Sequence, residues 1–195
     1  MPISKFKIAG VCGVVAPVVV LLSVVIAIFL APGFSWSNNA LSDLGASGTA
    51  ATVFNSGLVV GGILMMIFAA GLFGSFRGKI LGQVGGVVFS VTSVALAGIG
   101  IFPTTTGLHI YVSGAFFGLF FVSLLVIGAS MVLGKQNRKF GYISILVAIL
   151  AALPWVGWAF WMGGLAIPEA ISVTLALVWV IVMGLKLYRG DLMRQ

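Results

Sequence analysis

Long apolar runs separated by short polar segments make up most of this chain. Each run is close to the roughly 20 residues that a helix needs to cross a bilayer. No stretch shows the two-residue alternation of a barrel strand, and an open sheet would leave backbone groups unpaired in lipid. The pattern predicts an all-α, polytopic membrane protein with six transmembrane helices in one compact bundle. The expected spans are residues 8–31, 52–76, 80–102, 109–133, 140–162 and 168–188, in a single domain 1–195 with an external loop at 33–51.

Composition and charge support this prediction. The chain is 61% hydrophobic and only 7% charged, whereas soluble domains carry about 25% charged residues. All ten basic residues fall near the two chain ends or in the loops after the second and fourth spans. By the positive-inside rule this predicts a multi-pass cell-membrane protein with cytoplasmic N- and C-termini. Because no nucleic-acid-binding module accompanies the net charge of +7, we expect membrane lipids as partners and no nucleic acid.

Glycines recur at four-residue spacing in three of the expected spans. The pairs are Gly57 with Gly61, Gly82 with Gly86, and Gly114 with Gly118. Small residues at this spacing let two helix backbones approach each other closely in a membrane. We therefore expect all three pairs to lie at contacts between helices.

The segment 35–57, SWSNNALSDLGASGTAATVFNSG, is the main polar stretch between the apolar runs, and it carries no Lys or Arg. The expected loop 33–51, at about 19 residues, is long for a compact bundle, and such loops are often functional. Asn38 and Asn39 are able to cap a short turn over residues 40–44. The candidate binding residues of the segment are Asn38, Asn39, Ser42 and Asn55.

The candidate catalytic residues gather at one expected end of the bundle. His109, the only histidine, and Glu169 lie where the fourth and sixth spans begin, and Asp43 lies in the loop before the second. Each has an ordinary structural explanation, as a headgroup-level residue, a first-turn acid or a turn-closing residue. Because charge is scarce in this chain, we expect the three to share one outer-face site. Asp43 and His109 would form an acid–base pair, with Glu169 as an orienting or second acid group.

Three further residues are candidates for binding. Ser113 lies one turn beyond His109 on the same helix face. Trp155 and Trp158, followed by Trp161, form a stripe on roughly one face of the fifth span. An interfacial aromatic belt explains the stripe most simply, and the alternative is an apolar wall along the approach of a ligand.

The sequence predicts neither a metal nor a cofactor. Asp43, His109 and Glu169 are the residues able to hold a divalent cation. One histidine without an HExxH or CxxC motif is weak evidence for a zinc site. The chain has no P-loop, no GxSxG motif and no dinucleotide fingerprint. The middles of the spans carry no charged residue, which argues against a proton- or ion-coupled pump.

Four motifs resemble a known membrane family, domain of unknown function 998. They are SWSNNALSDLG at 35–45, FNSG at 54–57, HIYVS at 109–113 and IPEAIS at 167–172. The resemblance implies a six-helix bundle and a distant similarity to the Frag/DRAM/Sfk group, some members of which are tied to lipid handling. The characteristic polar positions that it implies are Asn39, Ser42, Asp43, Asn55, His109 and Glu169.

The function predicted first is an outer-face polar site that binds or modifies a lipid-like or amphiphilic molecule. Whether the protein is an enzyme stays open. One alternative is a non-catalytic subunit of a larger membrane complex, in which other membrane subunits are partners and the polar cluster holds the long loop. Another is a small facilitator or transporter, which would require polar residues running through the bundle.

The charge asymmetry yields a direct test of topology. A cysteine introduced at Ser47, in the expected external loop, should react with a membrane-impermeant thiol reagent in intact cells. A cysteine introduced at Gln136, in an expected cytoplasmic loop, should react only after the cells are opened. The reverse labelling pattern would invert the predicted orientation.

Overall fold

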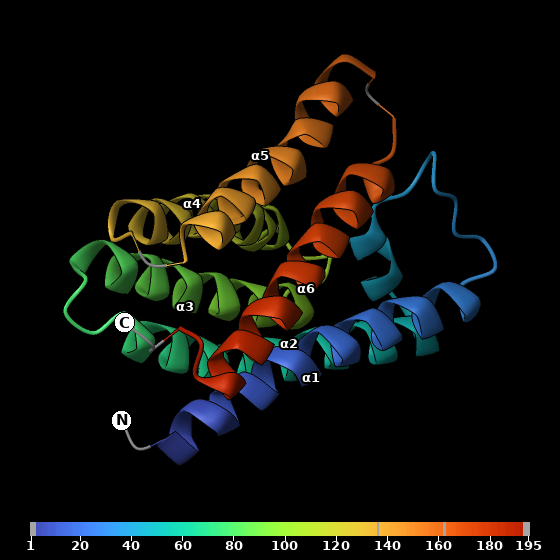
Figure 1. Ribbon diagram of the computed structural model, residues 1–195. Coiled ribbons are helices and arrows are strands. Elements are labelled where there is room, and N and C mark those ends of the chain that lie inside the picture. The colour runs from blue at the N-terminus through green and yellow to red at the C-terminus, as the bar shows by residue number, and fades with distance from the viewer. Residues whose placement is uncertain (1–2, 136, 162, 193–195) are drawn as a thin grey trace.

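The computed structural model describes residues 3–135, 137–161 and 163–192, which form α-helices and one short 3-10 helix. Six helices are long and apolar enough to cross a membrane, and the described residues contain no strand. This confirms the predicted all-α fold of a multi-pass membrane protein (Figure 1). The elements are α1 Ile3–Phe29, η1 Leu41–Gly45, α2 Gly48–Ser75, α3 Ile80–Ile101, α4 His109–Leu133, α5 Arg138–Trp161 and α6 Ala166–Arg189.

The helix boundaries differ most from expectation around the first loop. α1 begins at Ile3, because the segment with Lys5 and Lys7 continues the helix rather than preceding it. α2 begins at Gly48, four residues before the expected start of the second span at 52. The segment between α1 and α2 is therefore shorter than the expected loop, and η1 occupies its second half. Gln136, the expected cytoplasmic labelling position, lies outside the described residues.

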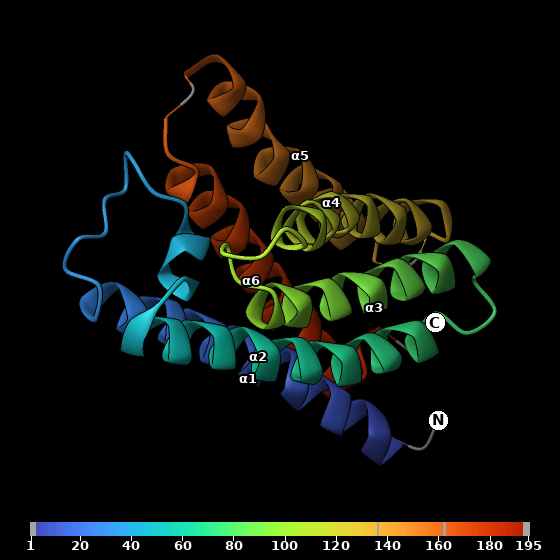
Figure 2. The same cartoon turned by 180° about the vertical axis from the view of Figure 1, so that it is seen from behind.

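Each long helix packs against its neighbours in the sequence, and α6 returns to α1, so the six helices form a closed ring. Figure 2, seen from behind, shows the same arrangement, with α5 at the periphery and η1 beside the start of α6. The end of the bundle that carries η1 and the N-termini of α2, α4 and α6 is called the η1 end below. The basic segments around Lys7, Lys79, Lys139 and Lys186 lie at the opposite end.

The crossings of α1 with α6 and of α4 with α5 are among those that bring helix backbones into direct contact. A Cβ atom at Gly10 of α1 would lie 2.7 Å from the carbonyl oxygen of Gly184 in α6. A Cβ atom at Gly128 of α4 would lie 2.8 Å from the carbonyl oxygen of Gly141 in α5. Only glycine fits such an approach, so these two crossings set how closely α1 packs on α6 and α4 on α5.

The predicted glycine pairs have two different outcomes. Gly57 and Gly61 of α2 face Ser23 and Val20 of α1, as expected, and a Cβ atom at Gly86 would lie 2.9 Å from the backbone of Phe73. The prediction for Gly114 and Gly118 is wrong, because both are exposed and nothing lies within 4 Å of the Cβ position of either one. Spacing alone does not show which face of α4 meets its neighbours.

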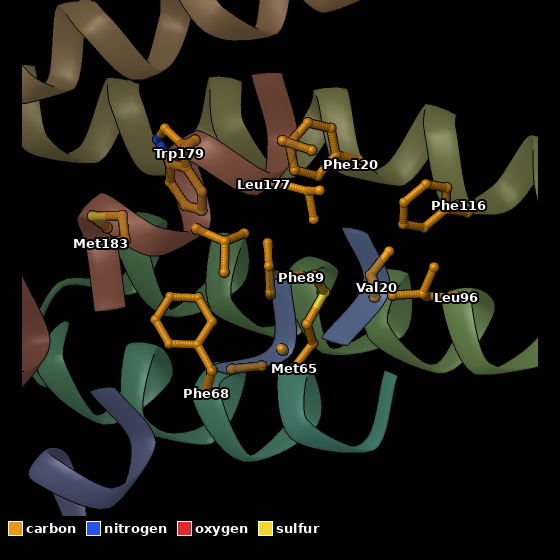
Figure 3. Close-up of a cluster of buried hydrophobic side chains, with 14 of the residues drawn as sticks. Val20, Met65, Phe68, Phe89, Leu96, Phe116, Phe120, Leu177, Trp179 and Met183 are labelled. Carbon is orange, nitrogen blue, oxygen red and sulfur yellow. The ribbon is translucent and has the colours of Figure 1, made fainter. Parts of the chain in front are cut away.

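The core lies between α1, α2, α3, α4 and α6 (Figure 3). The Phe89 ring meets Phe68 edge-on at 5.6 Å and lies 5.9 Å from Trp179. Trp179 Nε1 donates a hydrogen bond of 2.9 Å to Ser144 Oγ, which connects α6 to α5. Aromatic packing therefore fills the part of the bundle that lies away from η1.

The contrast between two glycines of α4 predicts a difference in stability. Gly128→Ala should lower the free energy of unfolding by about 1–3 kcal/mol, because the added methyl group overlaps the α5 backbone. Gly118→Ala, the control on the same helix, meets open space and should change stability by about 1 kcal/mol or less. Thermal melting of the two purified variants in detergent measures the difference. Equal melting temperatures would contradict the tight α4–α5 crossing.

Candidate functional site

The polar loop is anchored to the start of α6 by its backbone. Gly164 N–H donates to Ser37 O and Ala166 N–H donates to Asn39 O, both at 2.8 Å. A Cβ atom at Gly164 would lie 2.6 Å from Asn39 O, so this residue must be small. These contacts place η1 against the N-terminus of α6.

Glu169 completes this anchor from inside the bundle. Its side chain is only 6% exposed, and Oε2 accepts a hydrogen bond of 2.6 Å from the backbone N–H of Leu41, which is equally buried. Without this carboxyl group the first N–H of η1 would be buried and unpaired. Glu169 is thus more than a first-turn acid for its own helix. The backbone N–H of Ser42, the next residue of η1, also interacts with this carboxyl group.

Asp43 has a different position, although it lies close by. Its Oδ2 accepts hydrogen bonds from Ala40 N–H at 2.9 Å and from Asn39 Nδ2 at 3.1 Å, and the side chain is exposed. The two carboxyl groups therefore bind consecutive backbone N–H groups, those of Ala40 and Leu41. Asp43 closes the turn of η1 on its exposed side, while Glu169 holds η1 from the buried side.

His109 contacts neither carboxyl group. Its Nδ1 lies 2.7 Å from the carbonyl oxygen of Phe102, and its Nε2 lies 3.1 Å from Ser113 Oγ. Among the described residues, no hydrogen bond or ion pair joins His109 to Asp43 or Glu169. The expected acid–base pair of Asp43 and His109 is therefore not formed, because each side chain already binds its own turn.

A cavity of about 60 Å³ is lined by Glu169 but by neither Asp43 nor His109. It is lined by α1, α2, α3, α4, α6 and η1, with an almost wholly apolar wall, and Ser42, Ser113 and Glu169 at the η1 end. Along α6 its wall runs from Glu169 to Val180, which at about 1.5 Å per residue is about 16 Å. The apolar lining therefore extends from the η1 end toward the middle of α6. Figure 3 shows side chains of its wall, among them Val20, Met65, Phe89, Phe120 and Leu177.

The asparagine candidates organise the loop. Asn38 Nδ2 donates to Ser35 Oγ at 3.1 Å, and Asn39 Oδ1 accepts from Ser35 N–H at 2.9 Å. Asn55 Nδ2 donates to Gly45 O at 3.0 Å and so connects α2 to the end of η1. Asn55 Oδ1 is buried without a hydrogen-bond partner. None of these three residues lines the cavity.

The tryptophan candidates stabilise α5 and the turn that follows it. Trp155 Nε1 donates to Ser172 Oγ at 2.8 Å, and its ring lies 4.6 Å from that of Phe117. Trp158 Nε1 donates to Gly163 O at 2.7 Å. Neither ring lines the cavity. The side chain of Trp161 lies outside the described residues.

The sequence interpretation missed three parts of the site. The cavity itself, the Leu41 N–H bound to Glu169 and the Phe102 carbonyl bound to His109 involve backbone or apolar groups without a sequence signature. The spacing of His109 and Ser113, four residues apart, was a signal for their contact on one helix face. In the described ranges, no three His, Cys, Asp or Glu side chains form a group able to hold a metal ion.

Comparison with known proteins identifies one family. A family profile described as "Protein of unknown function (DUF998)" matches residues 14–186. No curated protein and no solved structure matches the chain. The matched range extends from α1 to α6 and includes all the candidate site residues, so the geometry of the η1 end lies within the family's shared region.

The two carboxyl groups should contribute differently to stability. Asp43→Asn should cost about 1 kcal/mol or less, because an amide oxygen still accepts from the Ala40 N–H on the exposed side. Glu169→Ala should cost about 1–3 kcal/mol, because the buried Leu41 N–H loses its acceptor. Glu169→Gln keeps an acceptor and should fall between the two. Melting curves in detergent test this order, and a larger loss for Asp43→Asn than for Glu169→Ala would contradict it.

Proposed function

The chain belongs to the DUF998 family, whose function is unknown, and we propose that this member binds a single-chain amphiphile in the cavity at the η1 end. The apolar chain of the ligand lies along the cavity, and its polar group lies against Glu169, Ser42 and Ser113. The proposal concerns a multi-pass membrane protein, for which lipids are the most abundant ligands.

The observation that carries the proposal is the Glu169 carboxyl group in the cavity wall. Its side chain is 6% exposed and lines an apolar cavity, while Oε2 accepts a hydrogen bond from Leu41 N–H. A carboxyl group accepts several hydrogen bonds, so a ligand that donates to it in these apolar surroundings is bound favourably. The hydroxyl group of Ser42, on a side chain 8% exposed, also lines the cavity without a hydrogen-bond partner among the described residues. Both groups favour a polar ligand atom at this end.

The length and lining of the cavity wall favour an alkyl chain. The wall is about 16 Å long on α6 and almost wholly apolar, and because its volume is about 60 Å³, a chain enters only as the lining side chains move apart. The side chains around its deeper part, including Phe89, Phe120 and Leu177, are apolar. Beyond them, Phe68, Leu72 and Met183 are fully buried. This packing favours a ligand-binding protein over a facilitator with a continuous polar path.

The charges at the η1 end favour a neutral or cationic polar group. Glu169 lines the cavity, Asp43 lies close to it, and no described Lys or Arg belongs to the cavity wall. A hydroxyl, amide or amine can donate to Glu169, whereas a phosphate or carboxylate would face a carboxyl group without a compensating cation. The proposed ligand class is thus a single-chain alcohol, amide, amine or partial ester.

We place the η1 end at the outer leaflet. The loops with Lys79 and Lys139, and the chain ends with Lys7 and Lys186, lie at the opposite end of the bundle. Under the positive-inside rule that end faces the cytoplasm. The labelling experiment at Ser47 and Gln136 tests this orientation independently of ligand binding.

One observation favours the alternative of a subunit in a larger complex. α5 is the least buried of the six helices and exposes several large apolar side chains, among them Leu146, Leu153 and Phe160. A second membrane protein or lipid would cover this face equally well. Copurification of a stoichiometric partner chain, together with no binding in the cavity, would favour the subunit.

Ligand binding is tested with three amphiphiles that share one chain length. Protein in lipid nanodiscs should bind monolaurin and laurylamine at least about tenfold more tightly than laurate, a difference of about 1.4 kcal/mol. Glu169→Gln should weaken monolaurin and laurylamine binding and strengthen laurate binding, because an amide that accepts from Leu41 N–H turns a donor toward the cavity. Asp43→Asn is the matched control and should keep the wild-type preference.

A second variant tests the place of binding. Ala176→Phe fills the cavity from α6 and should abolish the binding of all three amphiphiles. Native mass spectrometry and titration calorimetry measure both sets of variants. Equal affinity for laurate and monolaurin, or unchanged binding in Glu169→Gln and Ala176→Phe, would exclude the cavity as the site.

A further inference from the structure

The hydroxyl group of Ser113 differs from most other hydroxyls in these helices. In an apolar helix a serine commonly donates to a carbonyl group of the preceding turn. The serines that do so are Ser23, Ser75, Ser90, Ser93, Ser123 and Ser144. Ser113 Oγ instead lies 3.1 Å from Nε2 of His109. Its hydrogen-bond partner is therefore an imidazole, which can act as a base.

The Phe102 carbonyl group determines how this contact is polarised. A carbonyl oxygen only accepts hydrogen bonds, so His109 Nδ1, at 2.7 Å from it, carries a hydrogen atom. In the neutral imidazole Nε2 is then the acceptor, and Ser113 Oγ donates to it. The Ser113 hydroxyl group thus donates to the His109 imidazole, which in turn donates to the Phe102 carbonyl group. This is the arrangement by which a base activates a serine nucleophile while a third group orients the base.

Ser113 also faces the space where a substrate would lie. It lines the same cavity as Ser42 and Glu169, on the opposing helix α4. The Ser42 hydroxyl has no hydrogen-bond partner among the described residues and can donate to a carbonyl oxygen of the ligand. Glu169 Oε1 can accept from a hydroxyl of the same ligand. A nucleophile, a donor and an orienting acceptor thus line the η1 end of one apolar cavity.

We propose that Ser113 is the nucleophile of an acyl-transfer reaction on carboxylic esters of single-chain amphiphiles, with His109 as its base. The inference rests on the proposed binding function, because it uses the same cavity to hold the acyl chain. Substrates of this class are neutral partial esters of the monolaurin type. The Phe102 carbonyl group positions His109 and takes no part in bond making.

The reaction has two balanced steps. Ser113 Oγ forms a bond to the ester carbonyl carbon while its proton moves to His109 Nε2, and Ser42 donates to the carbonyl oxygen. The bond from carbon to the alcohol oxygen then breaks, and Nε2 returns the proton to the leaving alcohol. Water adds to the acyl-serine with His109 as base, and Ser113 leaves with its proton restored. The sum is ester plus water giving an acid and an alcohol.

The charges at this site also assist turnover. The product acid is a carboxylate at neutral pH, formed beside Glu169 in a cavity whose wall has no described basic residue. Its release is favoured over that of the neutral ester, which Glu169 retains through a hydrogen bond. The group that selects the substrate therefore disfavours the product.

Alkyl fluorophosphonates test the nucleophile directly, because Oγ of an activated serine bonds to phosphorus as fluoride leaves with the proton. The wild-type protein should form an adduct at Ser113, read by peptide mass spectrometry, and none at Ser123, which donates to its own helix. His109→Gln should lower the rate of labelling at least about 100-fold, since an amide can accept the hydroxyl hydrogen but cannot take the proton. Ser113→Ala should lose the adduct, and Asp43→Asn, outside the cavity wall, should keep it.

Each outcome separates this inference from the binding proposal. No Ser113 adduct with either an ethyl or a dodecyl fluorophosphonate would overturn the acyl-transfer role, even if monolaurin binding is intact. Labelling of His109→Gln at the wild-type rate would also overturn it. Conversely, a Ser113 adduct without monolaurin binding would refute the binding proposal and leave a reactive serine. The wild-type adduct decides the matter even if a variant fails to fold.

Discussion

A buried loop end must have its backbone N–H groups paired, and at the η1 end of this bundle the Glu169 carboxyl group meets that requirement. Its hydrogen bond to Leu41 N–H joins residues 128 positions apart in the sequence. The backbone bonds of Gly164 and Ala166 to the same loop continue the junction. Because η1 is held in this way, Leu41 and Ser42 become part of the cavity wall, and the loop closes the bundle instead of extending away from it.

The few polar side chains at the η1 end have different structural roles. Asp43 closes the turn of η1 on the exposed side, and Glu169 holds it from the buried side and lines the cavity. His109 is directed by the Phe102 carbonyl group toward Ser113. Among these groups, only Glu169, Ser113 and Ser42 face the cavity. The proposed site is therefore smaller and more buried than a wide outer-face cluster, which fits an alkyl chain better than a hydrated headgroup.

Packing explains why the cavity lies at this end. Toward the opposite end, glycines such as Gly10 and Gly184 bring helix backbones into contact, and large aromatic side chains such as Phe68 fill the remaining space. Near η1 the helices are separated by a loop segment as well as by side chains. Interiors are close-packed where regular helices meet, and the cavity lies where Leu41 and Ser42 of η1, with residues of five helices, form the wall.

The sequence by itself determined the six helices, the family and the gathering of Asp43 and Glu169 at one end, because span length and hydropathy are properties of consecutive residues. Only the tertiary structure decided which side of each helix is buried. It placed Gly114 and Gly118 on an exposed face of α4. The Asp43 side chain is exposed and that of Glu169 is buried. His109 contacts Ser113 and not Asp43. The physical reason is that helix rotation depends on contacts between distant segments. Such contacts here involve backbone N–H and carbonyl groups, which every residue type carries and no sequence pattern distinguishes.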